Sequence, residues 1–132
     1  MRTIRFAKAG AVVGIILLAG AFLSNYAHRT CIRTIQHKRV ALETIFRHRL
    51  VSGTDRNRVI EVLDSEGIQH SGYEVAGDSP VLADVLGAPA VIEAQVPVGT
   101  WCVTRWSVHF VFRFDAQGQY TSFTDKVEGT FY

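Results

Sequence analysis

The feature that most constrains this chain is an uncharged, apolar stretch near its start, residues 9–27, with the sequence AGAVVGIILLAGAFLSNYA. Lys8 and Arg29 bracket it. At about 1.5 Å per residue, a helix of this length could cross a hydrocarbon core of roughly 30 Å. The stretch therefore predicts a membrane segment, with the rest of the chain forming a domain tethered to it.

A cleaved signal peptide is the main alternative, because it also combines a basic start with an apolar run and a small-residue exit. The triplet Ala19-Gly20-Ala21 could supply that exit. The apolar run continues, however, through Phe22, Leu23 and Tyr26, which a cleavage site does not need. We therefore favour a retained anchor, and secretion to the periplasm after cleavage stays open as the alternative.

Basic residues flank the segment on both sides and bear on its orientation. Export of the short basic N-terminal tail would be unfavourable, so we expect that tail to stay in the cytoplasm. The prediction is a single-pass bacterial inner-membrane protein with an anchor over residues 1–27 and a periplasmic domain over residues 28–132. The basic residues are Arg2, Arg5 and Lys8 before the segment, and Arg29, Arg33, Lys38 and Arg39 after it.

Two further features concern possible partners of the membrane-proximal part. Gly10 and Gly14 form a G-x-x-x-G pair, a motif that allows two membrane helices to approach closely, so a homodimer is possible. The basic juxtamembrane residues could contact anionic lipid headgroups, although a solvated face explains them equally well. We expect no nucleic-acid binding, because no aromatic-plus-basic motif accompanies these charges.

The remainder of the chain is long enough for one hydrophobic core. Residues 28–53 show helical periodicity, with Ser52-Gly53 as the expected end of that helix. A second helix is expected from Thr54, as N-cap, to Gly67. The apolar face of the first helix comprises Ile35, Leu42, Ile45, Phe46 and Leu50.

The rest of the domain has the pattern of an antiparallel meander. Residues 101–114 alternate most clearly, with Trp106, Phe110 and Phe112 among the residues on one face. The expected fold class is α+β, with two helices packed on the aromatic face of a three- to four-stranded sheet. The expected strands are residues 69–76, 90–98 (with Pro97 suggesting an edge position or a strand end), 101–114 and 119–131, with a helical turn over 79–86, a hairpin turn over 115–118 and a bulge in the last strand.

Two segments, TDRNRVIEVLDSEGIQHSGY and VHFVFRFDAQGQYTSFTDKV, resemble the small α-α-β-β-β envelope domains of the SmpA/OmlA family of outer-membrane assembly lipoproteins. Thr54, Val59 and Leu63 match its helix pattern roughly, and Phe114, Asp115 and Gly118 match its hairpin. The likeness covers about half of the chain, and a membrane helix stands where that family has a lipidated cysteine. The resemblance implies this fold and a non-catalytic scaffolding or binding role.

The sequence contains no motif of a catalytic, metal or cofactor site, so we expect no enzyme activity and no cofactor. His70-Ser71 beside Asp115 or Asp125 could be imagined as a catalytic triad, but no nucleophile elbow or oxyanion setting accompanies them. Cys31 and Cys102 could form one disulfide in an oxidising compartment, but two independent thiols are the default expectation, because the two residues can lie too far apart.

The polar face of the long strand is the candidate partner-binding surface. It carries Arg105, His109 and Arg113, with Trp101 nearby, although a solvated sheet face is the simpler interpretation. The leading functional prediction is a membrane-anchored envelope protein whose domain binds another protein, as scaffold or accessory subunit. The alternative is an immunity or inhibitor protein that neutralises a toxin or lytic enzyme, and a hydrolase is the third possibility.

Overall fold

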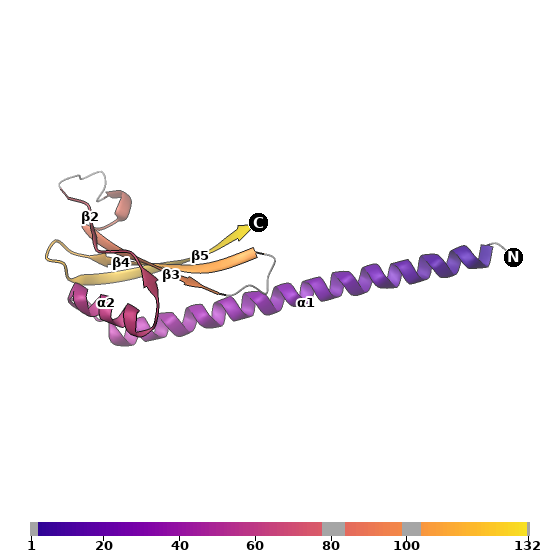
Figure 1. Ribbon diagram of the computed structural model, residues 1–132, viewed down its shortest axis with the longest axis horizontal. Coiled ribbons are helices and arrows are strands. Elements are labelled where there is room, and N and C mark those ends of the chain that lie inside the picture. Colours follow the sequence, from indigo (N-terminus) through magenta and orange to yellow (C-terminus); the bar gives the residue numbers. More distant parts are fainter. Residues whose placement is uncertain (1–2, 78–83, 99–103, 132) are drawn as a thin grey trace. The chain divides into compact units, whose positions relative to one another are not determined.

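The computed structural model describes residues 3–77, 84–98 and 104–131, with side chains described for residues 12–77, 84–98 and 105–129. The chain divides into two compact units, Met1–Thr34 and Ile35–Tyr132. Helix α1 (Thr3–Arg49) supplies the first unit and continues into the second (Figure 1). The second unit also contains helix α2 (Arg56–Ser65) and the strands of one antiparallel sheet.

The first unit presents an exposed apolar helical surface. The exposed fractions of Leu18 and Phe22 are 73% and 74%. In the part of the chain that the structure describes, α1 is the one helix that is long and apolar enough to cross a membrane. The predicted apolar N-terminal helix is thereby confirmed, and it continues without a break into the helix that was expected to follow it.

Within the described residues the sheet has five strands, and two of them pair with the same neighbour. Strands β3 (Ala90–Pro97), β4 (Thr104–Phe114) and β5 (Tyr120–Phe131) form an antiparallel meander in chain order. Strands β1 (Gln69–His70) and β2 (Glu74–Val75) both pair with β3, on the side away from β4. The expected α+β class with an antiparallel sheet is confirmed. Strand β3 is an inner strand of the sheet, and Pro97 is its last residue, so the expected place of Pro97 at a strand end is confirmed rather than an edge position.

The single strand expected over residues 69–76 is interrupted at Ser71. The Ser71 N–H donates to the Glu93 carbonyl oxygen at 2.7 Å, and the Ser71 hydroxyl accepts from the Glu93 N–H at 3.0 Å. The side chain thus takes the place of a backbone partner at this point, as serine commonly does outside regular structure. The strand is therefore divided into β1 and β2.

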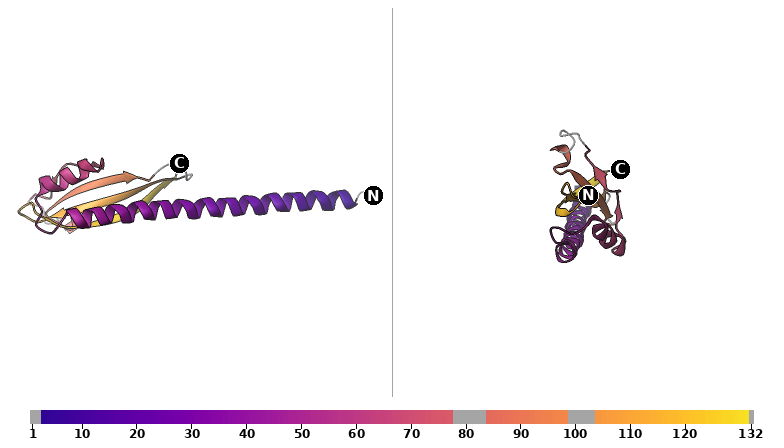
Figure 2. Two further views of the ribbon diagram at one scale, coloured as in Figure 1. Left: turned by 90° about the horizontal axis from the view of Figure 1, so that it is seen from below. Right: turned by 90° about the vertical axis from the view of Figure 1, so that its left-hand side faces the viewer.

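One face of the sheet, which we call the inner face, is covered by both helices (Figure 2). Phe46 of α1 is fully buried and makes edge-on contacts with Phe110 and Phe112 at ring-centroid distances of 5.0 Å. Edge-to-face packing of this kind adds about 0.5–1.5 kcal/mol per pair to the gain from burial. The predicted aromatic face is confirmed as the core, to which α2 adds Val59, Val62 and Leu63.

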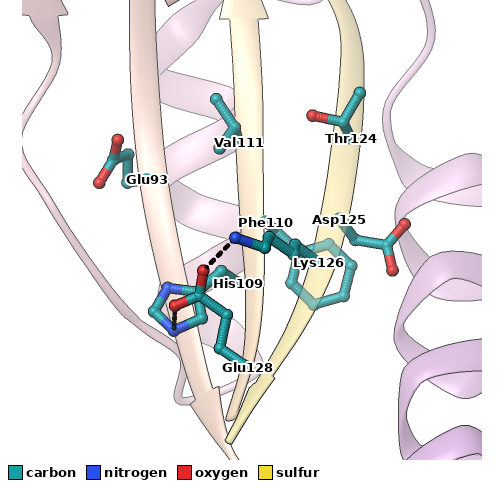
Figure 3. A pocket seen from close by; sticks show the side chains of 8 residues that line it. All are labelled: Glu93, His109, Phe110, Val111, Thr124, Asp125, Lys126 and Glu128. Carbon is teal, nitrogen blue, oxygen red and sulfur yellow. Dashed lines mark ion pairs between the residues drawn. The ribbon is translucent and has the colours of Figure 1, made fainter.

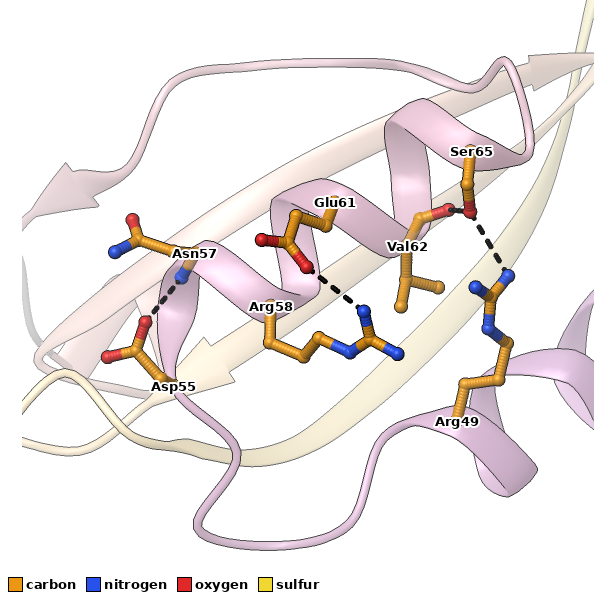
Figure 4. Close-up of polar contacts among 7 residues, drawn as sticks. All are labelled: Arg49, Asp55, Asn57, Arg58, Glu61, Val62 and Ser65. Carbon is orange, nitrogen blue, oxygen red and sulfur yellow. Dashed lines mark hydrogen bonds and ion pairs between the residues drawn. The ribbon is translucent and has the colours of Figure 1, made fainter.

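Helix α2 begins one residue later than the sequence suggested. The Asp55 carboxylate accepts from the Asn57 N–H at 2.8 Å and is the N-cap (Figure 4). Thr54 instead donates its hydroxyl to the Val51 carbonyl oxygen, which closes the preceding turn. At the other end, Gly67 has a φ of +65° and the following Ile68 is buried, so the predicted glycine cap is confirmed.

The connection between the helices is also corrected. Helix α1 ends at Arg49, before the Ser52-Gly53 pair that was expected to end it. Gly53 has a φ of +90° and donates its N–H to the Tyr120 carbonyl oxygen at 2.8 Å. The glycine therefore shapes the loop that pairs with the start of β5 rather than the helix terminus.

The hairpin between β4 and β5 has the predicted turn and the predicted bulge. The Asp115 carboxylate accepts from the Gln117 and Gln119 N–H groups, and Gly118 has a φ of +75°. The pairing between the strands shifts between Arg113 and Phe114, which leaves Thr121 as the extra residue. The shift places both Tyr120 and Phe123 against the inner face.

Of the expected helical turn over residues 79–86, the structure describes Asp84 to Leu86, which are helical and precede Gly87 with a φ of +67°. Residues 79–83 lie outside the described part of the chain.

Candidate binding face

The face of the sheet opposite the helices, which we call the outer face, is the candidate functional surface. Strand alternation directs the odd-numbered residues of β3 and β4 to this face, because their even-numbered neighbours fill the core. The register of β5 adds its even-numbered residues from Ser122 onward. The polar side chains at the centre of the face are Glu93, Gln95, Ser107, His109, Lys126 and Glu128.

A chain of polar contacts crosses the outer face from β3 to β5. Gln95 donates to the Ser107 hydroxyl at 3.2 Å, and that hydroxyl lies 3.0 Å from His109 Nε2. His109 Nε2 is 3.5 Å from one carboxylate oxygen of Glu128. The other carboxylate oxygen of Glu128 accepts from Lys126 Nζ at 2.7 Å (Figure 3). The face therefore carries a connected set of polar side chains that includes the Lys126–Glu128 ion pair, rather than a set of independent surface side chains.

The polar contacts on the outer face favour the ionised form of the Glu128 carboxyl group. The hydrogen bond from Lys126 and the positive charge of that ammonium group lower the pKa of the Glu128 carboxyl, and His109 acts in the same direction. The carboxylate is open to solvent, so salt screens these interactions.

Two shallow hollows adjoin on this face, and Glu93 and His109 line both. One, of about 350 Å³, extends toward β5 over Val111, Thr124 and Glu128 (Figure 3). The other, of about 320 Å³, extends toward β1 over His70 and Ser71. Both are open, whereas small-molecule sites typically enclose most of their ligand. A surface of this shape suits contact with another macromolecule better than enclosure of a substrate.

The contacts of His109 and Ser107 differ from those of a catalytic triad. In a triad, the carboxylate bonds to the imidazole nitrogen that faces away from the nucleophile. Here Ser107 and Glu128 both approach the same nitrogen, Nε2. The carboxylate therefore does not orient the ring toward the hydroxyl, and this arrangement lacks the geometry that activates serine.

The imagined triad around His70 is not assembled either. His70 Nδ1 lies 2.7 Å from the Ser71 carbonyl oxygen, and Nε2 lies 3.1 Å from an Asp64 carboxylate oxygen. Asp125 faces the core side of β5, where it pairs with Arg39. Both ring nitrogens of His70 are thus engaged, and the Nε2 contact ties β1 to α2. Among the residues described, no cluster of three or more His, Cys, Asp or Glu could hold a metal ion.

Three of the four residues predicted for the partner-binding face are described, and β4 places Arg105, His109 and Arg113 on the outer face. Arg113 donates to the Thr124 hydroxyl at 3.0 Å and lies against Gly87, so it is half-buried. Arg105 is exposed, and Trp101 lies outside the described residues. Lys126 and Glu128 were missed, because only the pairing register of β5 shows that they lie beside His109.

The cysteine and glycine predictions concern other parts of the chain. Cys31 is disulfide-bonded, and Cys102 lies outside the described residues. A Cβ at Gly14 would meet nothing within 4 Å, and a close approach of a second helix requires such open space. The surroundings of Gly10 lie outside the described part of the chain. Neither observation tests whether two copies associate.

The basic residues after the apolar stretch differ in their contacts. Arg29 and Arg33 are exposed in the first unit. In the second unit, Lys38 donates to the Pro97 carbonyl oxygen at 2.9 Å, and Arg39 forms an ion pair with Asp125. Lys38 and Arg39 therefore make contacts within the domain, which explains part of the basic cluster without a lipid partner.

Comparison with known protein families, with characterised proteins and with solved structures found no match to this chain. The resemblance to the SmpA/OmlA family accordingly stays a prediction.

Proposed function

We propose that this chain is a single-pass, membrane-anchored protein of the bacterial envelope whose α+β domain binds another protein without catalysis. The N-terminus would lie in the cytoplasm and the domain in the periplasm. The observation that carries the anchor is the uncovered apolar surface of α1 from Val12 to Tyr26. Removing apolar side chains from water is worth about 25 cal/mol per Å² of apolar area. A lipid bilayer would provide that apolar environment for the exposed side chains of α1.

The outer face supports the binding role. Both helices pack on the inner face, so they do not cover Ser107, His109 and Glu128 on the outer face. Charged and polar side chains that contact one another across the face provide specificity toward a complementary partner surface. The open hollows and the absence of triad geometry at His109 favour this role over hydrolysis.

Site-specific photocrosslinking tests the binding role. A photoreactive amino acid would replace His109 in the full chain, expressed at its natural level in cells that contain its native envelope. Replacement of Glu61, an exposed residue on α2, provides the matched control. We expect one discrete crosslinked protein from position 109 and none from position 61. Equal crosslinking from both positions, or from neither, would contradict the proposal.

A further inference from the structure

Strand β5 forms one edge of the sheet. On the side of β5 that points away from β4, the described part of the chain pairs only with its first residue. The Tyr120 N–H donates to the Thr54 carbonyl oxygen, and the Tyr120 carbonyl oxygen accepts from the Gly53 N–H, both at 2.8 Å. The loop between the helices thus closes one end of the edge. Beyond it, β5 continues to Phe131 with β4 as its only sheet neighbour among the described strands.

The backbone groups that point away from β4 follow from the hydrogen-bond alternation of antiparallel strands. The Trp106 carbonyl oxygen accepts from Val98, on the β3 side, so the even-numbered residues of β4 bond toward β3. Their partners on β5 must then direct N–H and C=O groups away from the sheet. These partners are Phe123, Asp125, Val127 and Gly129.

A hollow of about 420 Å³ lies beside the start of this edge, between the end of α1 and the bulge of β5. Arg47, Tyr120 and Phe123 are among its lining residues. The Arg47 guanidinium carbon lies 5.7 Å from the centre of the Phe123 ring. No acidic side chain of the described chain pairs with Arg47, whereas Arg39 and Arg49 on the same helix both have carboxylate partners.

Two features of β5 restrict what can pair with it. Asp125 faces inward from the edge strand and forms an ion pair with Arg39, and Thr121 bulges out of the ladder. Inward charges and bulges are devices that discourage indiscriminate edge-to-edge association. An edge with these devices favours a partner strand that complements its charge over a generic apolar strand.

We propose that the β5 edge binds an extended peptide segment of a partner protein as an added antiparallel strand, with an acidic side chain of that segment on Arg47. A residue opposite Phe123 would project toward the same face as Phe123 and so into the Arg47 hollow. Main-chain hydrogen bonds would provide affinity and the carboxylate–guanidinium pair would provide selectivity. The inference rests on the proposed binding function and specifies the partner's chemistry.

The test measures the binding of synthetic nonapeptides to the full chain in uncharged phosphatidylcholine nanodiscs. The probes alternate threonine and valine and carry either glutamate or lysine at the centre. We expect the glutamate peptide to bind about tenfold more tightly, the effect of one charge-assisted hydrogen bond. Methylating the amide nitrogen of the central glutamate should abolish binding, whereas methylating the preceding amide nitrogen, which faces away from β5, should not.

Arg47→Gln should remove the preference for glutamate. Arg58→Gln is the matched control, because it removes the same charge from an exposed residue on α2 that does not line the hollow. Binding that is insensitive to amide methylation or to Arg47→Gln would overturn the proposal. Failure of all peptides together with self-association of the chain through β5 would overturn it in favour of a second copy.

The two proposals fail separately. If position 109 captures one discrete protein while neither the peptides nor Arg47→Gln has an effect, strand addition is wrong and the outer face alone carries binding. If crosslinking from position 109 fails while the glutamate peptide binds as expected, the edge binds a partner segment and the outer face does not contribute.

Discussion

The apolar side chains of α1 between Val12 and Tyr26 and those of the inner face of the sheet are of the same kinds, but the first set is exposed and the second is buried. Phe22 is 74% exposed, whereas Phe46, farther along the same helix, is fully buried. The difference lies in the partner, because strands β4 and β5 supply aromatic rings against Phe46. One helix therefore carries two apolar surfaces, of which one completes a protein core and the other requires a different apolar environment.

The largest expected effect separates the two surfaces directly. Phe46→Ala should destabilise the domain by about 3–5 kcal/mol, because it opens a cavity among three aromatic rings. Phe22→Ala, in the exposed stretch, should leave the domain's stability unchanged. Chemical unfolding of both variants in detergent, followed by tryptophan fluorescence, measures the difference. Equal destabilisation would mean that the two surfaces are not distinct.

A second prediction tests how closely the inner face is packed. Trp106 pairs with Gly129 across β4 and β5, and a Cβ at Gly129 would lie 2.9 Å from its ring. Gly129→Ala should therefore cost about 1–3 kcal/mol, as overpacking does. Gly72→Ala is the control, since a Cβ there would meet nothing within 4 Å. Equal stability of the two variants in thermal unfolding would show that the Trp106 ring moves freely.

The third prediction concerns the cap that fixes α2 against the inner face. Asp55→Ala removes the carboxylate that accepts the Asn57 N–H, and should cost about 1 kcal/mol. Thr54→Val should cost less, because its hydroxyl closes a turn outside the helix. A larger loss for the Thr54 variant in urea unfolding would restore the assignment of Thr54 as the cap.

The smallest effect is expected on the outer face. Lys126 lowers the folded-state pKa of Glu128, so the ion pair contributes stability above the unfolded pKa of about 4.3 and loses it as pH falls through the folded value. Glu128→Gln should remove this contribution, so it should lower stability slightly near neutral pH and leave stability at pH 3 unchanged. Unfolding between pH 3 and 7 at low and high salt measures it, and a salt-independent loss would contradict the solvent-exposed placement.

The sequence predicted elements that depend on local pattern. Alternation identified β4 and its inward aromatic face, and Gly67 and Gly118 marked a helix end and a turn. The N-cap was assigned one residue early, because Thr54 and Asp55 are both good caps and only the fold of the preceding loop decides between them. The division of the strand over residues 69–76 was missed, because it depends on where Ser71 meets Glu93 of β3.

The candidate surfaces were predictable only in part. His109 and Arg105 were assigned to one face by the alternation of a single strand. The contacts of Lys126 and Glu128 with that face depend on the bulge after Arg113, whose exact position a sequence does not determine. The pair formed by Arg39 and Asp125 joins residues 86 positions apart, and it arises only when α1 lies against β5.

The most direct test of the account is the state of residues 9–27 in the mature protein. Membranes from cells that express the full chain would be extracted with alkaline carbonate, and the intact mass of the retained protein would be measured. We expect the chain to stay in the membrane pellet with residues 9–27 still attached. A mature chain that begins near Phe22 and appears in the soluble periplasmic fraction would contradict it.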